Sequence, residues 1–100
     1  MILLNTTFHV HPSVDVAFRQ WVREKYLPAA ERAGVSREPL VSRICGESED
    51  GGLNYAVQFK SESLDVARRW HDTEAQGLKE ALFRLYGERV LHFTTYMEII

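Results

Sequence analysis

Hydrophobic and polar residues alternate along residues 1–10 with the period of a β-strand. One face of this predicted strand carries Ile2, Leu4, Thr6, Phe8 and Val10, and the other carries Leu3, Asn5, Thr7 and His9. Residues 90–100 repeat the pattern, with Leu91, Phe93, Thr95, Met97 and Ile99 against His92, Thr94, Tyr96 and Glu98. Both ends of the chain therefore predict strands with one apolar face and one mixed polar face.

Helical spacing replaces this alternation after the first strand. Apolar residues three and four apart predict a helix over residues 14–33, with Ser13 as its N-cap and Gly34 as its stop. Pro28 lacks a backbone donor and crowds the preceding turn. A kink or break is therefore expected at Tyr26-Leu27-Pro28, near Leu27, with Pro28 starting a final short turn.

A second helix follows the third predicted strand. A serine, either Ser61 or Ser63, is expected to cap its start, and Gly87 is expected to end it. Thr73 and Gln76 have the spacing of a second capping box. That spacing predicts a helix that is broken just before Thr73.

Two more strands are predicted between the helices, at residues 40–45 and 53–60. The segment Gly46–Gly52 between them is acidic and rich in glycine, which is typical of a turn, so the two strands are expected to form a hairpin. In the second of these strands, Tyr55 and Phe59 alternate with the more polar Asn54 and Gln58.

The element order is β-α-β-β-α-β, which predicts an α+β, ferredoxin-like fold in a single domain over residues 1–100. Right-handed crossovers place the first strand of the antiparallel four-stranded sheet between the third and the fourth. Both helices should cover one face of the sheet. That face is expected to bear Ile2, Leu4, Phe8, Val57, Phe59, Phe93 and Met97.

Composition narrows the class of protein. The formal net charge of -2 provides no general attraction to nucleic acid or to an anionic membrane. No apolar run approaches the ~20 residues that cross a bilayer, the first residues do not resemble a signal peptide, and Cys45 is the single cysteine. A cytoplasmic protein is expected, with neither nucleic acid nor membrane as a partner.

The opposite face of the sheet, which the helices do not cover, is predicted to be mixed and polar. It should carry Asn54, Ala56 and Gln58 from the third strand, with Val41, Arg43 and Cys45 from the second. RNA-recognition motifs share this element order but display aromatic residues at that place, so RNA binding is not expected. Two interpretations remain: a face in contact with solvent, or a face that a second sheet covers.

The chain resembles a small bacterial family that is classified as a domain of unknown function. The resemblance spans nearly the whole chain and rests on Trp21-Val22, Tyr26-Leu27-Pro28, Tyr55 to Phe59, Tyr86-Gly87 and Tyr96 to Ile100. The family falls in the dimeric α/β-barrel superfamily, in which two ferredoxin-like sheets face each other across a two-fold axis. The resemblance thus implies a homodimer. Related sequences often carry His where this chain has Tyr26, so proton transfer that depends on that position would lack its usual group here.

The candidate binding residues follow from the predicted pairing of the end strands. If Leu3 lies opposite Glu98, His9 lies opposite His92 on the uncovered face. The ligand-binding residues expected in this cleft are His9, Arg43, Gln58, His92 and Tyr96. Such a group suits acid–base chemistry or carboxylate binding, and structural hydrogen-bonded networks that stabilise a dimer collect the same residue types.

His9 and His11 lack a third ligand at a recognisable spacing, so no metal site is expected, and no cofactor is expected. Two function classes remain. The first is a homodimer that binds a small molecule in a polar cleft between facing sheets. The alternative is a cofactor-free monooxygenase or isomerase of the superfamily that the chain resembles. An enzyme should have a pocket that reaches His9, His92 or Tyr96 from solvent, whereas a structural network should be closed.

Overall fold

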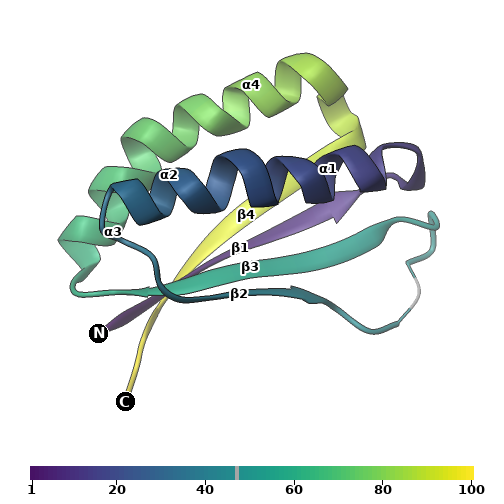
Figure 1. Ribbon diagram of the computed structural model, residues 1–100. Coiled ribbons are helices and arrows are strands. Elements are labelled where there is room, and N and C mark those ends of the chain that lie inside the picture. Colours follow the sequence, from purple (N-terminus) through teal and green to yellow (C-terminus); the bar gives the residue numbers. More distant parts are fainter. Residues whose placement is uncertain (47) are drawn as a thin grey trace.

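The computed structural model describes residues 1–46 and 48–100. Its four strands form one antiparallel sheet in the order β2-β3-β1-β4 (Figure 1). The strands are β1 (Ile2–Val10), β2 (Arg37–Arg43), β3 (Leu53–Ser61) and β4 (Val90–Glu98). β1 therefore lies between β3 and β4, and the predicted ferredoxin-like fold is confirmed.

The first helix changes its geometry just before Pro28 but does not break there. α1 (Asp15–Trp21) continues through a π-helical segment, Val22–Tyr26, into α2 (Leu27–Arg32), and Figure 1 shows the two as one coil. In this segment the amide of Leu27 donates to the carbonyl of Val22, five residues back. The predicted irregularity before Pro28 is confirmed as this π-helical segment, and Pro28 lies in the first turn of α2, whereas the alternative of a break is wrong.

The start of this helix also differs from the prediction. Pro12–Val14 forms a 3₁₀ turn, and Ser13 does not cap α1. Instead, the Ser13 amide donates to His11 Nδ1 at 3.1 Å. The expected end is confirmed, because α2 is followed by Gly34 with a φ of +73°.

The second helix is continuous as well. α3 (Leu64–Trp70) runs through a second π-helical segment, His71–Ala75, into α4 (Gln76–Tyr86), so the predicted start at Thr73 is wrong. The Thr73 hydroxyl donates to the carbonyl of Arg69 at 2.6 Å within the helix.

Of the two serines proposed as caps for this helix, Ser63 is the N-cap and accepts from the Val66 amide. Ser61 is buried and donates to the carbonyl of Val35. The predicted end at Gly87 is confirmed, because that residue follows α4 with a φ of +56°.

β2 and β3 pair antiparallel, which confirms the predicted hairpin. β2 begins at Arg37, three residues before its expected start, and a register shift between Arg37 and Leu40 interrupts its pairing. The turn predicted over residues 46–52 includes Glu47, which lies outside the described residues.

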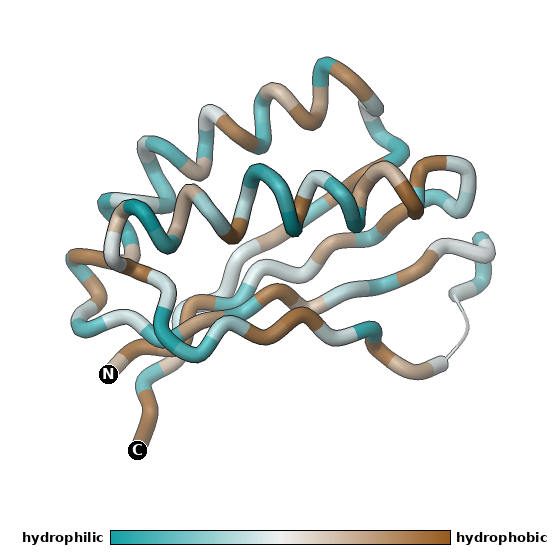
Figure 2. Tube along the Cα trace, in the orientation of Figure 1, coloured by the Kyte–Doolittle hydropathy of each residue, from teal (hydrophilic) through white to brown (hydrophobic). Residues whose placement is uncertain are grey.

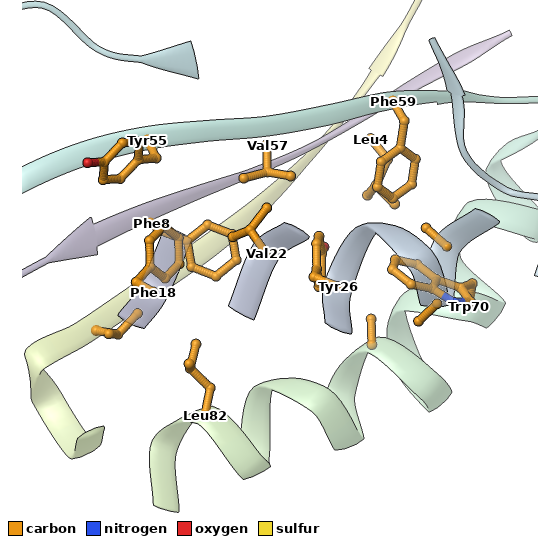
Figure 3. Close-up of a cluster of buried hydrophobic side chains, with 14 of the residues drawn as sticks. Leu4, Phe8, Phe18, Val22, Tyr26, Tyr55, Val57, Phe59, Trp70 and Leu82 are labelled. Carbon is orange, nitrogen blue, oxygen red and sulfur yellow. The ribbon is translucent and has the colours of Figure 1, made fainter. Parts of the chain in front are cut away.

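Aromatic side chains fill the layer between the helices and the covered face of the sheet. Phe8 of β1 is fully buried, with ring centroids 5.0 Å from Phe18 and 6.0 Å from Tyr26. Tyr26 lies between Val22 and Trp70 in this layer (Figure 3). Hydrophilic and hydrophobic residues alternate along the turns of both helices, as expected for helices with one face on a core (Figure 2).

The fourth strand presents the opposite faces from those that its hydrophobic pattern predicted. Leu3 pairs with Met97, one residue away from the expected partner Glu98. A shift of one residue moves every side chain of a strand to the other face of the sheet. Phe93 and Met97 therefore lie on the uncovered face, and the expectation that they face the helices is wrong.

The short connection before β4 accounts for this register. Only the three residues Gly87–Arg89 separate α4 from β4, and Val90, the first residue of the strand, is buried opposite Val10. Alternation from Val90 then places Thr94 on the covered face, beneath polar side chains of the helices.

Candidate functional site

The covered face of β4 meets a buried lysine. Lys79 of α4 is 2% exposed. Its Nζ lies 2.8 Å from Nε2 of His71 and 3.1 Å from Oγ1 of Thr94. In the part of the chain that the structure describes, Lys79 has no carboxylate within 4.0 Å. A buried lysine without a carboxylate is uncommon, because an ammonium group loses much of its hydration on burial.

Hydroxyl groups extend this polar cluster beneath the helices. Thr94 Oγ1 lies 2.9 Å from Thr6 Oγ1 on the neighbouring strand, and Thr6 Oγ1 lies 3.3 Å from the Tyr26 hydroxyl. Thr94 Oγ1 is also 2.9 Å from His71 Nε2. The result is a continuous hydrogen-bonded chain from Lys79 to Tyr26, which we call the Lys79 network.

The two π-helical segments supply two members of the Lys79 network. Tyr26 is the last residue of the first segment, and His71 is the first residue of the second. A π-helical turn displaces side chains from the positions that a regular α-helix would give them. The irregular turns therefore position a phenol and an imidazole on the covered face, and such turns are frequent at functional sites.

The partners of His71 indicate its tautomer. Its Nδ1 lies 3.3 Å from an Asp72 carboxylate oxygen, and its Nε2 faces the ammonium of Lys79. A proton on Nδ1 donates to the carboxylate and leaves Nε2 as the acceptor for Lys79. Asp72 thus orients His71, and His71 accepts from Lys79.

Burial changes the proton affinity of the whole cluster. It lowers the pKa of Lys79 to about 8, and it raises the pKa of Tyr26 to about 12. The pKa of His71 is lowered by burial first and by the charge of Lys79 second. An amine with a pKa of about 8 beside a neutral imidazole can exchange protons near neutral pH.

A groove on the surface between α4 and β4 borders Lys79. Its volume is about 350 Å³. It is lined by Gln76, Lys79, Glu80, Phe83, Arg84 and His92. Five of these residues lie at helical spacing on one side of α4, and His92 faces them from β4. Lys79 is the member of the Lys79 network that borders this groove.

The structure separates the five residues that the sequence predicted to share a cleft. His9 and Gln58 lie on the uncovered face, as expected, because His9 pairs with Asn54 and Gln58 pairs with Asn5. Arg43 pairs with Tyr55, whose side chain is buried beneath the helices, so Arg43 lies on the helix side at the exposed edge of the sheet.

His92 and Tyr96 are also on the helix side. The one-residue shift of β4 places His92 opposite Phe8 and Tyr96 opposite Leu4. His92 borders the groove, whereas the Tyr96 ring packs edge-on against His71 at a centroid distance of 5.9 Å. The predicted pairing of His9 with His92 is therefore wrong, because the two imidazoles lie on opposite faces of the sheet.

His9 has partners of its own on the uncovered face. Nδ1 lies 2.7 Å from the Asn54 side-chain oxygen, and Nε2 lies 2.7 Å from an Asp50 carboxylate oxygen. The bond to Asn54 and the bond to Asp50 both require a protonated ring nitrogen, so together they raise the pKa of His9. A pocket of about 490 Å³ borders His9 and extends to Arg89.

The groove between α4 and β4 is the better candidate for a functional site because no ion pair within residues 1–46 and 48–100 neutralises the charge of Lys79. Asp50 balances the charge of a protonated His9, whereas among the described residues no carboxylate lies within 4.0 Å of Lys79. The described part of the chain contains no group of three or more His, Cys, Asp and Glu residues that could hold a metal ion.

Sequence reasoning overlooked the residue at the centre of this site. Lys79 occupies the apolar stripe of its helix, four residues after Ala75 and three before Leu82. A charged residue in such a stripe signals either a helix end or a buried polar site, and position 79 is in the middle of the helix. Thr6, in the apolar face of the first strand, is a similar signal.

Comparison with known proteins places the chain in a family. The family model described as a domain of unknown function (DUF4286) matches residues 1–100. The protein belongs to this family. The resemblance in the sequence to a family of unknown function is thereby confirmed. No curated protein matches the chain at significant similarity.

Solved structures share the fold at low sequence identity. A protein from Deinococcus radiodurans, assigned as an antibiotic biosynthesis monooxygenase, has a TM-score of 0.72 at 16% identity, over 99% of this chain and 92% of its own. An ethyl tert-butyl ether D (EthD) family protein from Bacillus halodurans has a TM-score of 0.62 at 17% identity, with both chains covered completely. These similarities establish the ferredoxin-like fold. In the described part of the chain, no helix is both long and apolar enough to cross a membrane.

The lowered pKa of Lys79 predicts a characteristic dependence of stability on pH. The unfolded chain keeps the Lys79 proton up to its ordinary pKa of 10.5, whereas the folded protein releases it at about 8. The unfolded state therefore binds more protons between these values, and the free energy of unfolding should rise from pH 8 to pH 10 by about 1–3 kcal/mol. Above pH 10 the raised pKa of Tyr26 acts in the opposite direction.

Urea denaturation of three proteins tests this. The wild type and the exposed-lysine control Lys25→Met should gain stability over this pH range, and Lys79→Met should lack the gain. Lys79→Met should also be no less stable than the wild type at pH 7, because it removes a buried charge. If the free energy of unfolding depended on pH in the same way in the wild type and in Lys79→Met, the lowered pKa of Lys79 would be contradicted.

The surroundings of His9 predict that it titrates independently of His92. In Asp50→Asn the pKa of His9 should fall, because a carboxylate no longer accepts from Nε2. Gly52→Ala should have the same effect, since a Cβ there would lie 2.4 Å from His9 Cε1 and displace the ring. NMR titration of the imidazole protons measures both, with His92 as the internal reference. A change in the His92 titration on replacement of His9 with Ala would show that the two rings interact after all.

Proposed function

We propose that the protein is a cytoplasmic homodimer that binds a small molecule in the groove between α4 and β4, against Lys79. The observation that carries this proposal is a fully buried lysine that has no carboxylate partner among the described residues and that lines a groove open to solvent. The proposed site replaces the predicted cleft between facing sheets, because His92 and Lys79 lie on the helix side.

A purely structural role explains this arrangement poorly. Burial of an ammonium costs several kcal/mol of hydration, and a structural network offsets this cost with a carboxylate or with bonds to all of the donors. Lys79 has three N–H donors, and the described residues account for two of them, at His71 and Thr94. The remaining donor and the charge suit a ligand in the groove.

The proposed dimer rests on the uncovered face of the sheet. β4 presents Leu91, which is 50% exposed, Phe93, which is 63% exposed, and Met97 in one row on this face. On the uncovered face, as far as the structure describes it, the charged side chains of β1 and β3 are paired, His9 with Asp50 and Lys60 with Glu38. An apolar row without competing charge suits a second copy of the same face across a two-fold axis.

The cytoplasmic location is the remaining part of the proposal. Cys45 is exposed and is the single cysteine of the chain. An exposed free thiol suits a reducing compartment, in which it is not oxidised.

An enzymatic function is the second candidate, of the cofactor-free monooxygenase or isomerase class. It is favoured by the position of Lys79, since an amine with a pKa of about 8 beside His71 can take a proton from a bound carbon acid. The groove reaches His92 from solvent, as was expected of an enzyme. The solved structure that is assigned as an antibiotic biosynthesis monooxygenase shares the fold, and the fold by itself selects no reaction.

Native mass spectrometry tests the proposed site. Protein purified from the cells that normally produce it should carry a small molecule as a reproducible mass increment. The increment should persist in Lys25→Met and be lost in Lys79→Met. A wild-type mass without any increment, or an increment that survives in Lys79→Met, would contradict the proposed site.

Light scattering with size-exclusion chromatography tests the proposed dimer. The wild type should have about twice the monomer mass of 11.6 kDa. Phe93→Glu should be monomeric, because it would bury an unpaired charge in the interface. The control Leu85→Glu, at an exposed apolar position of α4, should remain a dimer. A monomeric wild type at micromolar concentration would disprove this part of the proposal.

A further inference from the structure

We infer that the groove between α4 and β4 binds a small carboxylate with an apolar side group, and that binding is accompanied by uptake of a proton. The inference rests on the proposed function and adds the chemical class of the ligand. Three properties of the groove support it: the basic side chains that line it, its apolar wall and the spare donor of Lys79.

The basic side chains of the groove come from two elements. Lys79 and Arg84 lie on α4, and His92 faces them from β4. Glu80 is the one carboxylate among the lining residues of the groove. A bound carboxylate would accept from the free donor of Lys79, and such a charge-assisted bond is stronger than one between neutral groups.

The apolar wall is the Phe83 side chain. This ring is 58% exposed, on the same side of α4 as Lys79 and one turn further along the helix. A ligand that places its carboxylate at Lys79 would bring an adjacent apolar group over Phe83. The pairing of one buried cation with one exposed aromatic ring selects an amphipathic monoanion over a highly charged ligand such as a polyphosphate.

The groups around Lys79 explain why the ligand would bring a proton. The helix that leads into α4 contributes His71 with its partner Asp72, and the first helix contributes the phenol of Tyr26. β4 contributes His92 and Tyr96, and Arg68 lies over the Tyr96 ring. Glu80 and Arg84 are neighbours of Lys79 on α4. Within this set, burial lowers the pKa of His92, and the charge of Lys79 lowers it further, as does that of His71 when it is protonated.

A carboxylate reverses these effects, because a nearby negative charge favours the protonated forms of Lys79 and His92. The pKa values of both groups should therefore rise in the complex, so the complex holds more protons than the free protein near pH 8. By linkage, affinity should fall as the pH rises through about 8, the pKa of Lys79 in the free protein.

Calorimetry with phenylacetate and its neutral isostere phenylacetamide tests the inference on the intact protein. At pH 7 phenylacetate should bind about tenfold or more tightly than phenylacetamide, which corresponds to one charge-assisted hydrogen bond. Titrations at pH 8 in two buffers of different ionisation enthalpy should reveal proton uptake for phenylacetate alone. Affinity for phenylacetate should fall by about tenfold between pH 7 and pH 9.5, with little change for the amide.

Variants and NMR locate the site. Lys79→Met should reduce the preference for phenylacetate to about twofold or less, and Lys25→Met should leave it unchanged. Since a variant can also disturb the fold, the His92 imidazole is followed in the wild type. Phenylacetate should raise its pKa, and His9 on the other face should not respond.

The outcomes separate this inference from the proposed function. Equal binding of the two probes would overturn the carboxylate class and leave a small-molecule groove in place. Phenylacetate binding that is unchanged in Lys79→Met, or that shifts His9 and not His92, would overturn the site. If neither probe binds at millimolar concentration, this inference fails, and the retained-ligand measurement still decides the proposed function independently.

Discussion

The hydrogen bonds of one buried ammonium connect the two layers of this fold. Lys79 reaches from α4 to Thr94 on β4, and His71 joins it from the helix that leads into α4. An ammonium without these acceptors would be costly to bury, since it would lose its hydration without replacement. The orientation of β4, the position of His71 and the groove beside α4 are all compatible with this requirement.

The need of the Lys79 ammonium for hydrogen-bond acceptors also relates to the irregular turns in both helices. In a regular α-helix the side chains of Tyr26 and His71 would point in other directions around the helix axis, away from Thr6 and Thr94. The wider π-helical turns hold them in the Lys79 network and, at Pro28, accommodate a residue that otherwise interrupts a helix. Local irregularity and the candidate site therefore coincide, as expected where function overrides ideal geometry.

The two faces of β4 carry different kinds of side chain. The inner face supplies Thr94 and Tyr96 to the polar cluster, so the large apolar residues of the strand are left for the outer face. An edge strand with an exposed apolar row invites association, and a second copy of the sheet is the partner that suits a row without unpaired charge. The proposed ligand site and the proposed dimer interface thus lie on opposite faces of one strand.

The element order, the ferredoxin-like topology, the hairpin and the ends of both helices follow from the sequence alone. Alternation, helical spacing and glycine positions are local properties, and Gly34 and Gly87 end their helices for local conformational reasons. His9 and Gln58 were assigned to the correct face because each lies in a strand whose apolar residues point to one side.

Tertiary structure decided the register of β4, the continuity of the helices and the site. Apolar Phe93 and polar Thr94 each suit a buried or an exposed position, and the choice depends on the connection from α4 and on Lys79, which is distant in sequence. Side chains from Thr6 to Thr94 form the Lys79 network, and their convergence depends on packing between elements. Local sequence patterns do not encode contacts between distant elements. The sequence alone therefore predicted the fold, whereas the tertiary structure decided which groups meet at the site.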